Sequence, residues 1–368
     1  MTRHIITRTV GALVVMAVAA QAWPSSQARY FGYEKWKKRV IERQLDPNEV
    51  VYPFETTPEM MDWVREKLQH DSQKDVLVQL NVLQTALLNT NYSFSYEKTR
   101  TLTAAEAFEA QEGNCMSFTS LFVALSRGLG IQTYLVAVRR APGIEKIDGV
   151  TVVNNHVVAA YQSPRKVHIY DFYDSSTEPY FHKKVIDDIA ASAIYHTNLG
   201  AEGIRTGDLD AARHDLEIAT TLVPEWAPAW VNLGVARYRS GDAESAVQAY
   251  KTALLSDPVN TSALTNMAIA YQSLGRDREA GILLEVVAAE TRSPYTLIAV
   301  ADMEMVRGDF DSARRYLRRA RWWYRKEPEV YDALARLALA EHDFAKADKR
   351  TRKAAELRRR QAAAAKRR

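Results

Sequence analysis

Cysteine is almost absent from this sequence, since Cys115 is the only one among 368 residues. An intramolecular disulfide is therefore excluded, and no cysteine lies near the N-terminus to carry a lipid anchor. Apolar runs long enough to cross a bilayer are also missing, because the N-terminal run VGALVVMAVAA has only 11 residues. No glycine-rich phosphate loop is present, so no phosphate-binding motif of that kind is indicated.

The N-terminus has the three parts of a secretory signal peptide. Arg3 and Arg8 precede the apolar run, and the small-x-small triplet at residues 20–22 follows it. We therefore predict a signal peptide over residues 1–22 and an exported protein, periplasmic if its source has two membranes and secreted otherwise. An uncleaved N-terminal anchor is the alternative. In an oxidising compartment, a single cysteine points to a thiol with a chemical role.

Charge is small overall and unevenly distributed. The chain carries +4, but the tail over residues 346–368 holds eleven basic residues against two acidic ones. Without this tail and the two signal arginines, the remainder is near −7. Because the basic character belongs to one end, we predict no specific nucleic-acid binding. The tail lacks glycine and proline, which predicts a solvated helical cap; contact with anionic lipid or another polyanion is the alternative.

The C-terminal half repeats with a period of about 34 residues. Glycines recur at spacings of 34, 34 and 33, at Gly207, Gly241, Gly275 and Gly308. His342 continues the series 34 residues later, and an alanine lies five residues after each of these positions. Prolines close the units at Pro224, Pro258, Pro294 and Pro328. This pattern, most complete over residues 227–258, resembles the tetratricopeptide repeat. The resemblance implies about five helix pairs over residues 188–360, of which the first is atypical, with His196 and Gly203 at positions where aromatic residues are usual.

Stacked helix pairs of this family curve and bind partners along a concave face. By their positions in the units, the residues predicted to contact a protein or peptide partner are Arg239, Gln272, Asp302 and Arg336. The aromatic residues of the run RWWYR, at Arg321–Arg325, are interpreted as packing between units, with a binding surface as the alternative.

The N-terminal half shows no repeat. Three stretches before residue 90 have helical periodicity, and Thr103 with Glu106 is a capping-box pattern that begins a short helix. Gly113 suits the end of that helix. From Thr133 onward the pattern indicates strands, predicted at residues 133–138, 153–161 and 166–173.

Cys115 lies in the stretch QEGNCMSFTSL, just before an apolar run. Asn114 suits an N-cap, which predicts a helix from Cys115 to Leu129 that Gly130 ends. A thiol at the first helical position lies beside unsatisfied N–H groups and the positive end of the helix dipole. The thiolate form is favoured there, so Cys115 is a candidate nucleophile.

The two later strands offer a base and an orienting group, which a thiolate nucleophile needs. A hairpin centred between Ser163 and Pro164 places His156 opposite Asp171 on one sheet face. The same face carries mostly apolar side chains and is expected to face the interior, while Tyr161, Lys166 and His168 point away. His168 and Asp174 are the rival base and acid.

Gly-Asn-Cys at the start of an apolar helix, followed by a strand histidine and a strand aspartate, resembles the transglutaminase-like superfamily. The resemblance covers residues 92–173 and implies a papain-like α+β domain, placed here at residues 23–182. It also implies Cys115 as nucleophile, His156 as general base and acid, and Asp171 as the residue that orients the imidazole. The tryptophan that often precedes the family's cysteine is missing, and Gln111 is the candidate second oxyanion donor.

The predicted fold is thus a transglutaminase-like domain followed by an all-α repeat solenoid and the basic tail. One hypothesis is an exported cysteine hydrolase or acyltransferase that acts on amide bonds through a thioester. The other is a non-catalytic envelope adaptor whose repeats bind partners. The remaining histidines show no ligand spacing, so we predict no metal site and no cofactor.

Overall fold

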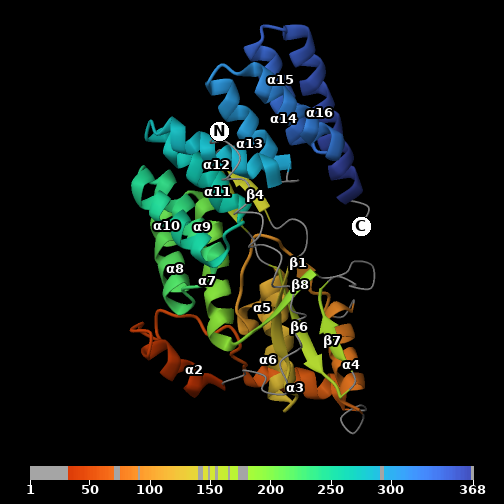
Figure 1. Ribbon diagram of the computed structural model, residues 1–368. Helices are drawn as coiled ribbons and strands as arrows, with labels where there is room; N and C mark the ends of the chain where they lie inside the picture. Colours follow the sequence, from red (N-terminus) through yellow and green to blue (C-terminus); the bar gives the residue numbers. More distant parts are fainter. Residues whose placement is uncertain are drawn as a thin grey trace.

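The computed structural model describes residues 32–69, 75–89, 92–139, 144–147, 150–153, 156–164, 166–172, 181–290 and 294–365. The predicted signal peptide lies outside this part of the chain. Figure 1 shows a mixed helix-and-sheet part and, above it, a stack of helices coloured green to blue. The predicted α+β domain followed by an all-α solenoid is therefore confirmed.

The sheet has four antiparallel strands in the order β7-β6-β3-β8. Their bounds are β3 Tyr134–Arg139, β6 His156–Gln162, β7 Val167–Tyr170 and β8 Phe181–Ile186. One hydrophobic core joins the sheet to helices α3 (Pro58–Leu68), α4 (Val76–Leu88), α5 (Ala104–Ala110) and α6 (Cys115–Gly128). Strand β8 has no counterpart among the predicted strands, because its sequence FHKKVI has two central lysines where apolar residues would mark a strand.

Helix α6 begins at Cys115, as the sequence predicts. The Asn114 side chain caps it by accepting hydrogen bonds from the N–H groups of Met116 and Ser117, at 3.0 and 3.1 Å. Every residue from 115 to 126 is buried, which explains the apolar and small side chains around the whole helix. Gly130 follows with φ of 81°, which ends the helix in a conformation natural to glycine.

Helix α5 confirms the capping box but ends earlier than predicted. Thr103 and Glu106 bond reciprocally to each other's backbone N–H groups. The helix stops at Gln111, which adopts the left-handed conformation with φ of 55°. Gly113 is needed for a different reason, because a Cβ there would lie 2.4 Å from the Cβ of Ser117 in α6. Gly113 and Glu112 form the short strand β2 (Glu112–Gly113), which pairs with β1 (Ser95–Tyr96).

The helical part contains five helix pairs within the described residues. Their bounds are α7 Asp188–Thr206, α8 Leu209–Leu222, α9 Ala227–Arg239, α10 Ala243–Ser256, α11 Thr261–Ser273, α12 Asp277–Glu290, α13 Pro294–Val306, α14 Phe310–Trp323, α15 Pro328–Ala340 and α16 Phe344–Ala365. The four periodic glycines have φ between 71 and 90°, and His342 adopts the same left-handed conformation at 59°. Small helix residues allow close packing, since a Cβ on Gly234 would lie 2.3 Å from the buried Tyr250 ring. The predicted repeat array is confirmed.

The first repeat is atypical because it packs on the N-terminal segment. His196 of α7 accepts a hydrogen bond at Nε2 from the Val51 N–H (3.0 Å) and pairs through Nδ1 with Asp215 of α8 (2.7 Å). Helix α2 (Gly32–Ile41) lies against α7, where Trp36 Nε1 donates to Ser192 Oγ at 3.0 Å. Helix α7 contributes side chains to three hydrophobic clusters, including the core around α6. It therefore belongs structurally to both parts of the chain.

Two further strands form a hairpin outside the main sheet. They are β4 (Ile144–Ile147) and β5 (Val150–Val153), which pair with each other in antiparallel register. This hairpin, termed the β-arm, follows β3 and precedes β6, and β5 contacts α9 and α11 of the array. Of the single strand predicted over residues 153–161, residues 156–161 are confirmed in β6, whereas Val153 belongs to β5.

Of the three aromatic residues in the run at the end of α14, Tyr324 packs between repeats as interpreted, but Trp322 and Trp323 do not. The buried stripe of this helix is Ser312, Ala313, Leu317 and Ala320. Tyr324 continues that stripe and packs against the same cluster. Trp322 and Trp323 fall outside it and are 68% and 50% exposed. Helical periodicity therefore overrides the general tendency of tryptophan to be buried.

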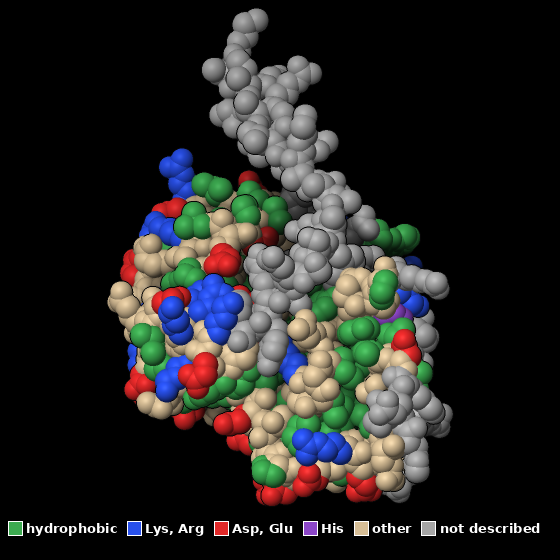
Figure 2. Space-filling model, turned by 90° about the horizontal axis from the view of Figure 1, so that it is seen from below, with side chains coloured by type: hydrophobic (Ala, Val, Ile, Leu, Met, Phe, Trp, Pro, Cys, Tyr) green, Lys and Arg blue, Asp and Glu red, His purple; other side chains and the backbone are tan. Residues whose placement is uncertain are grey.

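The basic tail forms most of helix α16, as its composition predicts. Some of its charges are paired within the helix, as in Arg352 with Asp348 at 2.7 Å, and Arg358 reaches Asp332 of α15. Among the described helices, none is both long and apolar enough to cross a membrane. Figure 2 shows basic and acidic side chains interspersed on the face seen from below.

Candidate active site

Cys115 is held in place by a network around the N-cap of its helix. The residue is 7% exposed, so it lies at the margin of the core. Asn114 Nδ2 donates to Thr101 Oγ1 at 2.7 Å, while the amide oxygen of the same side chain accepts from the helix N–H groups. Ser117 Oγ accepts from the Leu102 N–H at 2.8 Å. These bonds tie the first turn of α6 to the segment before α5 and fix the sulfur.

His156 and Asp171 are brought together from two neighbouring strands. His156 is the first residue of β6, and Asp171 follows the last residue of β7. His156 Nε2 lies 3.0 Å from Asp171 Oδ2, and the Asp171 side chain is 1% exposed. Its other oxygen accepts from the Phe172 N–H at 2.7 Å. Gln84 of α4 donates to the Asp171 carbonyl at 2.9 Å. The carboxylate is thus buried, oriented and anchored from two directions.

The imidazole of His156 interacts with the cysteine as well as with the carboxylate. Burial by itself lowers the pKa of His156, because it disfavours the charged form. Hydrogen bonds with Asp171 and Cys115, together with the negative charges of both partners, outweigh burial and raise the pKa of His156 to about 10. Since Nε2 faces Asp171, Nδ1 is the nitrogen that remains for the sulfur. The imidazolium is therefore the favoured form at neutral pH.

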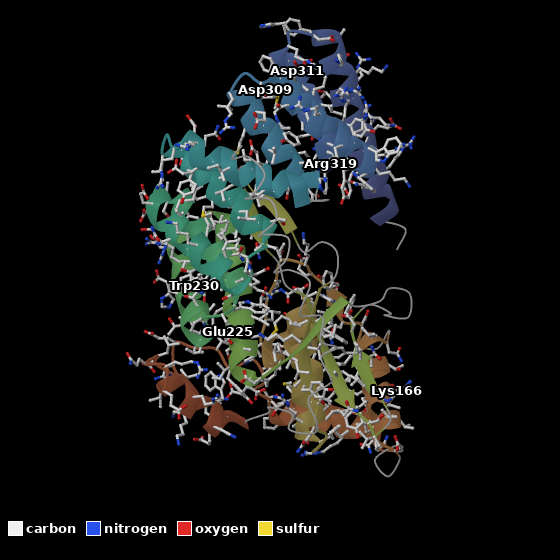
Figure 3. All side chains as sticks on the ribbon, in the orientation of Figure 1. Lys166, Glu225, Trp230, Asp309, Asp311 and Arg319 are labelled. Atoms are coloured by element: carbon white, nitrogen blue, oxygen red, sulfur yellow. The ribbon has the colours of Figure 1, made fainter. Side chains whose placement is uncertain are left out.

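The hairpin register differs by two residues from the predicted one. Ala159 pairs with Tyr170, so the turn is centred one residue later than expected and Val158, not His156, falls opposite Asp171. His156 and Asp171 are therefore diagonal rather than direct neighbours. A shift of two residues keeps both on the same face, so the contact survives. Lys166 lies in this turn, at the edge of the domain far from the array (Figure 3).

The prediction that Tyr161 points away from the interior is wrong. Val157 and Ala159 of β6 belong to the core around α6, and Tyr161 packs against that core. Val158 and Ala160 belong to a second buried cluster. His156, the first residue of β6, interacts with Cys115 at the start of α6. Thr119 Oγ1 of α6 donates to the Val157 carbonyl at 3.1 Å and holds the two elements together there.

The rival base, His168, does not join this cluster. His168 Nε2 lies 3.2 Å from Ser163 Oγ, at the turn end of the hairpin. Burial lowers the pKa of His168, and the nearby Lys166 charge lowers it further. Asp174 lies outside the described residues. Within the described ranges, no group of three or more histidine, cysteine, aspartate or glutamate side chains is arranged to hold a metal ion.

The residues that support the site were not predicted from the sequence. Gln84, which donates to the Asp171 carbonyl, lies 87 positions earlier in the chain. No local sequence pattern therefore indicates this contact. Phe172, the residue after Asp171, packs against Phe94, Tyr96 and Phe118, with ring centroids 5.4 to 6.0 Å apart. Gln111, the candidate oxyanion donor, is exposed at the end of α5.

The four residues predicted to bind a partner lie on the first helices of their repeats. Arg336 of α15 binds both carboxylate oxygens of Asp302 on α13, each at 2.8 Å. Arg239 of α9 donates to the Ile204 carbonyl of α7, and Gln272 is half-buried on α11. Three of the four therefore make contacts between neighbouring repeats.

Comparison with known proteins separates the chain into the same two parts. Residues 81–169 match the transglutaminase-like superfamily, and residues 204–263 and 231–293 match the tetratricopeptide repeat. No curated protein matches this chain.

Similar solved structures include a crystal structure of the APC/C hetero-tetramer Cut9-Hcn1, with 17% identity, coverage of 45% of this chain and 33% of that chain, and a TM-score of 0.40. A crystal structure of MamA protein has 16% identity, coverage of 46% and 93%, and a TM-score of 0.35. The Pseudomonas aeruginosa protein pilF has 22% identity, coverage of 45% and 75%, and a TM-score of 0.39. This chain spans about one third of the first of these proteins.

Proposed function

From a chain that joins a transglutaminase-like domain to tetratricopeptide repeats, we propose a cysteine hydrolase or acyltransferase that acts on amide bonds. The repeats bind its protein partner or substrate. The observation that carries this proposal is the position of His156, which interacts with Asp171 on one side and Cys115 on the other. Such a chain of nucleophile, base and orienting group supports covalent catalysis.

The reaction follows from the charges at this site. The Cys115 thiolate attacks the amide carbonyl carbon, and the backbone N–H of Cys115 donates a hydrogen bond to the developing oxyanion. The His156 imidazolium then donates its proton to the leaving amine, which leaves a thioester on the sulfur. Water or a second amine next attacks this thioester, His156 takes up its proton, and the thiolate returns. Asp171 keeps the imidazole oriented throughout.

The alkylation rate of Cys115 with iodoacetamide between pH 4 and 9 tests the proposal. About 1% of an ordinary thiol is ionised at pH 6.5. We expect the full chain to react at that pH at least tenfold faster than the His156→Ala variant. His168→Ala is the matched control, because it removes a histidine from the neighbouring strand that does not join the site, and it should behave like the wild type. A wild-type rate that rises only near pH 8.5 would mean an inert thiol and would refute the enzyme proposal.

The missing tryptophan before Cys115 favours a second candidate, an envelope adaptor in which the papain-like domain binds a peptide without turnover. The segment AFEAQEGNC contains no such residue. Loss of biological activity in Cys115→Ala supports the enzyme, whereas retention of activity supports the adaptor.

We also propose export through the signal peptide at residues 1–22, followed by contact of the C-terminal end with an anionic surface. Two observations support this contact, namely the basic composition of helix α16 and the exposed Trp322 of α14, whose ring centroid lies 5.3 Å from the Arg325 guanidinium. Cell fractionation tests export. Co-sedimentation with anionic, but not neutral, lipid vesicles tests the contact.

A further inference from the structure

The β-arm connects the candidate active site with the inner helices of the repeats. In the main sheet, β3 and β6 pair as far as Val138 opposite His156. The chain then leaves the sheet, forms the β4–β5 pair and comes back. Only two positions separate Val153, the end of β5, from His156. The arm therefore lies in sequence between β3 and β6, and β6 begins with His156.

The far end of the β-arm rests on the array. Strand β5 contacts α9 and α11, the first helices of the second and third repeats. Val152 is 1% exposed and belongs to the hydrophobic cluster formed by these helices, together with Leu233 of α9 and Met267 of α11. Figure 1 shows the arm beside α11, separate from the sheet below it. A branched aliphatic side chain of one domain therefore fills an apolar position on the other.

We propose that β5 is an internal ligand of the second and third repeats, and that an extended peptide with a branched aliphatic residue competes for the same position. In the structure β5 packs on the repeat helices, and His156 Nε2 lies 3.0 Å from Asp171 Oδ2. The packed arm and the complete His156–Asp171 contact therefore occur together. Displacement of β5 frees the strand end that carries His156 and slows the reaction of Cys115. The expected effect on the Cys115 thiol rests on the proposed function, whereas the binding of β5 to the repeats does not.

Binding of the arm is tested with a fluorescein-labelled peptide of residues 144–153, measured by anisotropy. In Val152→Asp a buried carboxylate is unfavourable, so the variant's own arm leaves the helices and the peptide takes its place. We expect the peptide to bind Val152→Asp at least tenfold more tightly than the wild type, with Val152→Thr, a milder change of the same shape, in between. Val259→Asp is the matched control, because Val259 is 70% exposed on the array. Equal binding to all four proteins, or no binding to any, overturns the proposal.

The effect on the site is tested by alkylation of Cys115 at pH 6.5. We expect Val152→Asp, and the wild type with saturating peptide, to react several-fold more slowly than the untreated wild type, whereas Val259→Asp does not. Thermal unfolding and helical content measured on each variant identify a folding defect, and the peptide effect on the wild type needs no variant. If His156→Ala leaves the wild-type rate unchanged, the proposed function fails. If His156→Ala slows the alkylation but displacement of the arm does not, only the proposed coupling between the arm and Cys115 fails.

Discussion

The ion pair between Arg127 and Asp188 joins the cysteine helix to the first repeat helix, and its removal measures how firmly the two parts are connected. Arg127 lies in the last turn of α6, and Asp188 is the first residue of α7. Arg127 Nη1 is 3.0 Å from Asp188 Oδ1, and the side chains are 6% and 1% exposed. Arg127 Nε also donates to the Thr133 carbonyl at 3.0 Å, and its guanidinium lies 4.8 Å from the Phe54 ring centroid.

At this burial, loss of one partner leaves the other charge without compensation. Such a change costs about 3–5 kcal/mol, and we expect Asp188→Asn to lower the free energy of unfolding by that amount. Arg127→Met should cost about the same, with about 1 kcal/mol more for the lost hydrogen bond to the Thr133 carbonyl. The double variant buries neither charge. It should therefore cost less than the sum of the two single changes, with a coupling energy of about 2–3 kcal/mol.

Urea unfolding of the four proteins, followed by tryptophan fluorescence and circular dichroism, completes this double-mutant cycle. The control is Asp210→Asn, which breaks an exposed pair with Arg213, where the side chains are 44% (Arg213) and 92% (Asp210) exposed. It should change stability by less than about 0.5 kcal/mol. Single variants of the buried pair that each cost less than about 1 kcal/mol, or costs that simply add, would refute the reasoning.

Three further predictions concern single positions. Gly234→Ala should lower stability by about 1–3 kcal/mol, because the new methyl group meets the Tyr250 ring at 2.3 Å; an unchanged melting temperature contradicts this. His342→Gly should raise stability by about 0.5–1 kcal/mol in urea titrations, because it relieves a left-handed conformation, and a lower midpoint would show that the histidine is not strained. His156 should titrate by NMR near pH 10, and Asp171→Asn should move that midpoint down; a wild-type midpoint near 6.5 argues against the site. Because the folded pKa is raised, the stabilisation from this proton is complete below pH 6.5 and is lost as pH rises through about 10.

Features governed by neighbouring residues were predictable from the sequence. The start of α6 depends on Asn114 and the two N–H groups that it caps, all within four residues. The repeats were predictable because each unit imposes the same turn and the same close helix contact, which leaves a period in the sequence. His342 shows that the position, rather than the glycine, defines the turn.

Features that depend on distant contacts were not predictable. Side chains alternate between the two sheet faces with a period of two, so a register shift of one residue moves a side chain to the other face but a shift of two does not. The turn decides the register here, through the Ser163 N–H and hydroxyl, which both donate to the Lys166 carbonyl. The dipeptide at residues 148–149, Asp-Gly, is a strong hairpin signal for the β-arm. No sequence pattern, however, relates Val152 to the helices of the array.

Helix α7 has a consequence for how this chain can be divided or recombined. Three of its isoleucines lie in three different hydrophobic clusters. Ile194 belongs to the core of the domain that contains Cys115, Ile189 to the cluster that includes α2, and Ile204 to the interior of the array. A cut before α7 opens the first domain, and a cut after it removes half of the first repeat. The two halves are therefore not interchangeable modules, and a hybrid that grafts this array onto another domain must bring α7 and a surface to receive it.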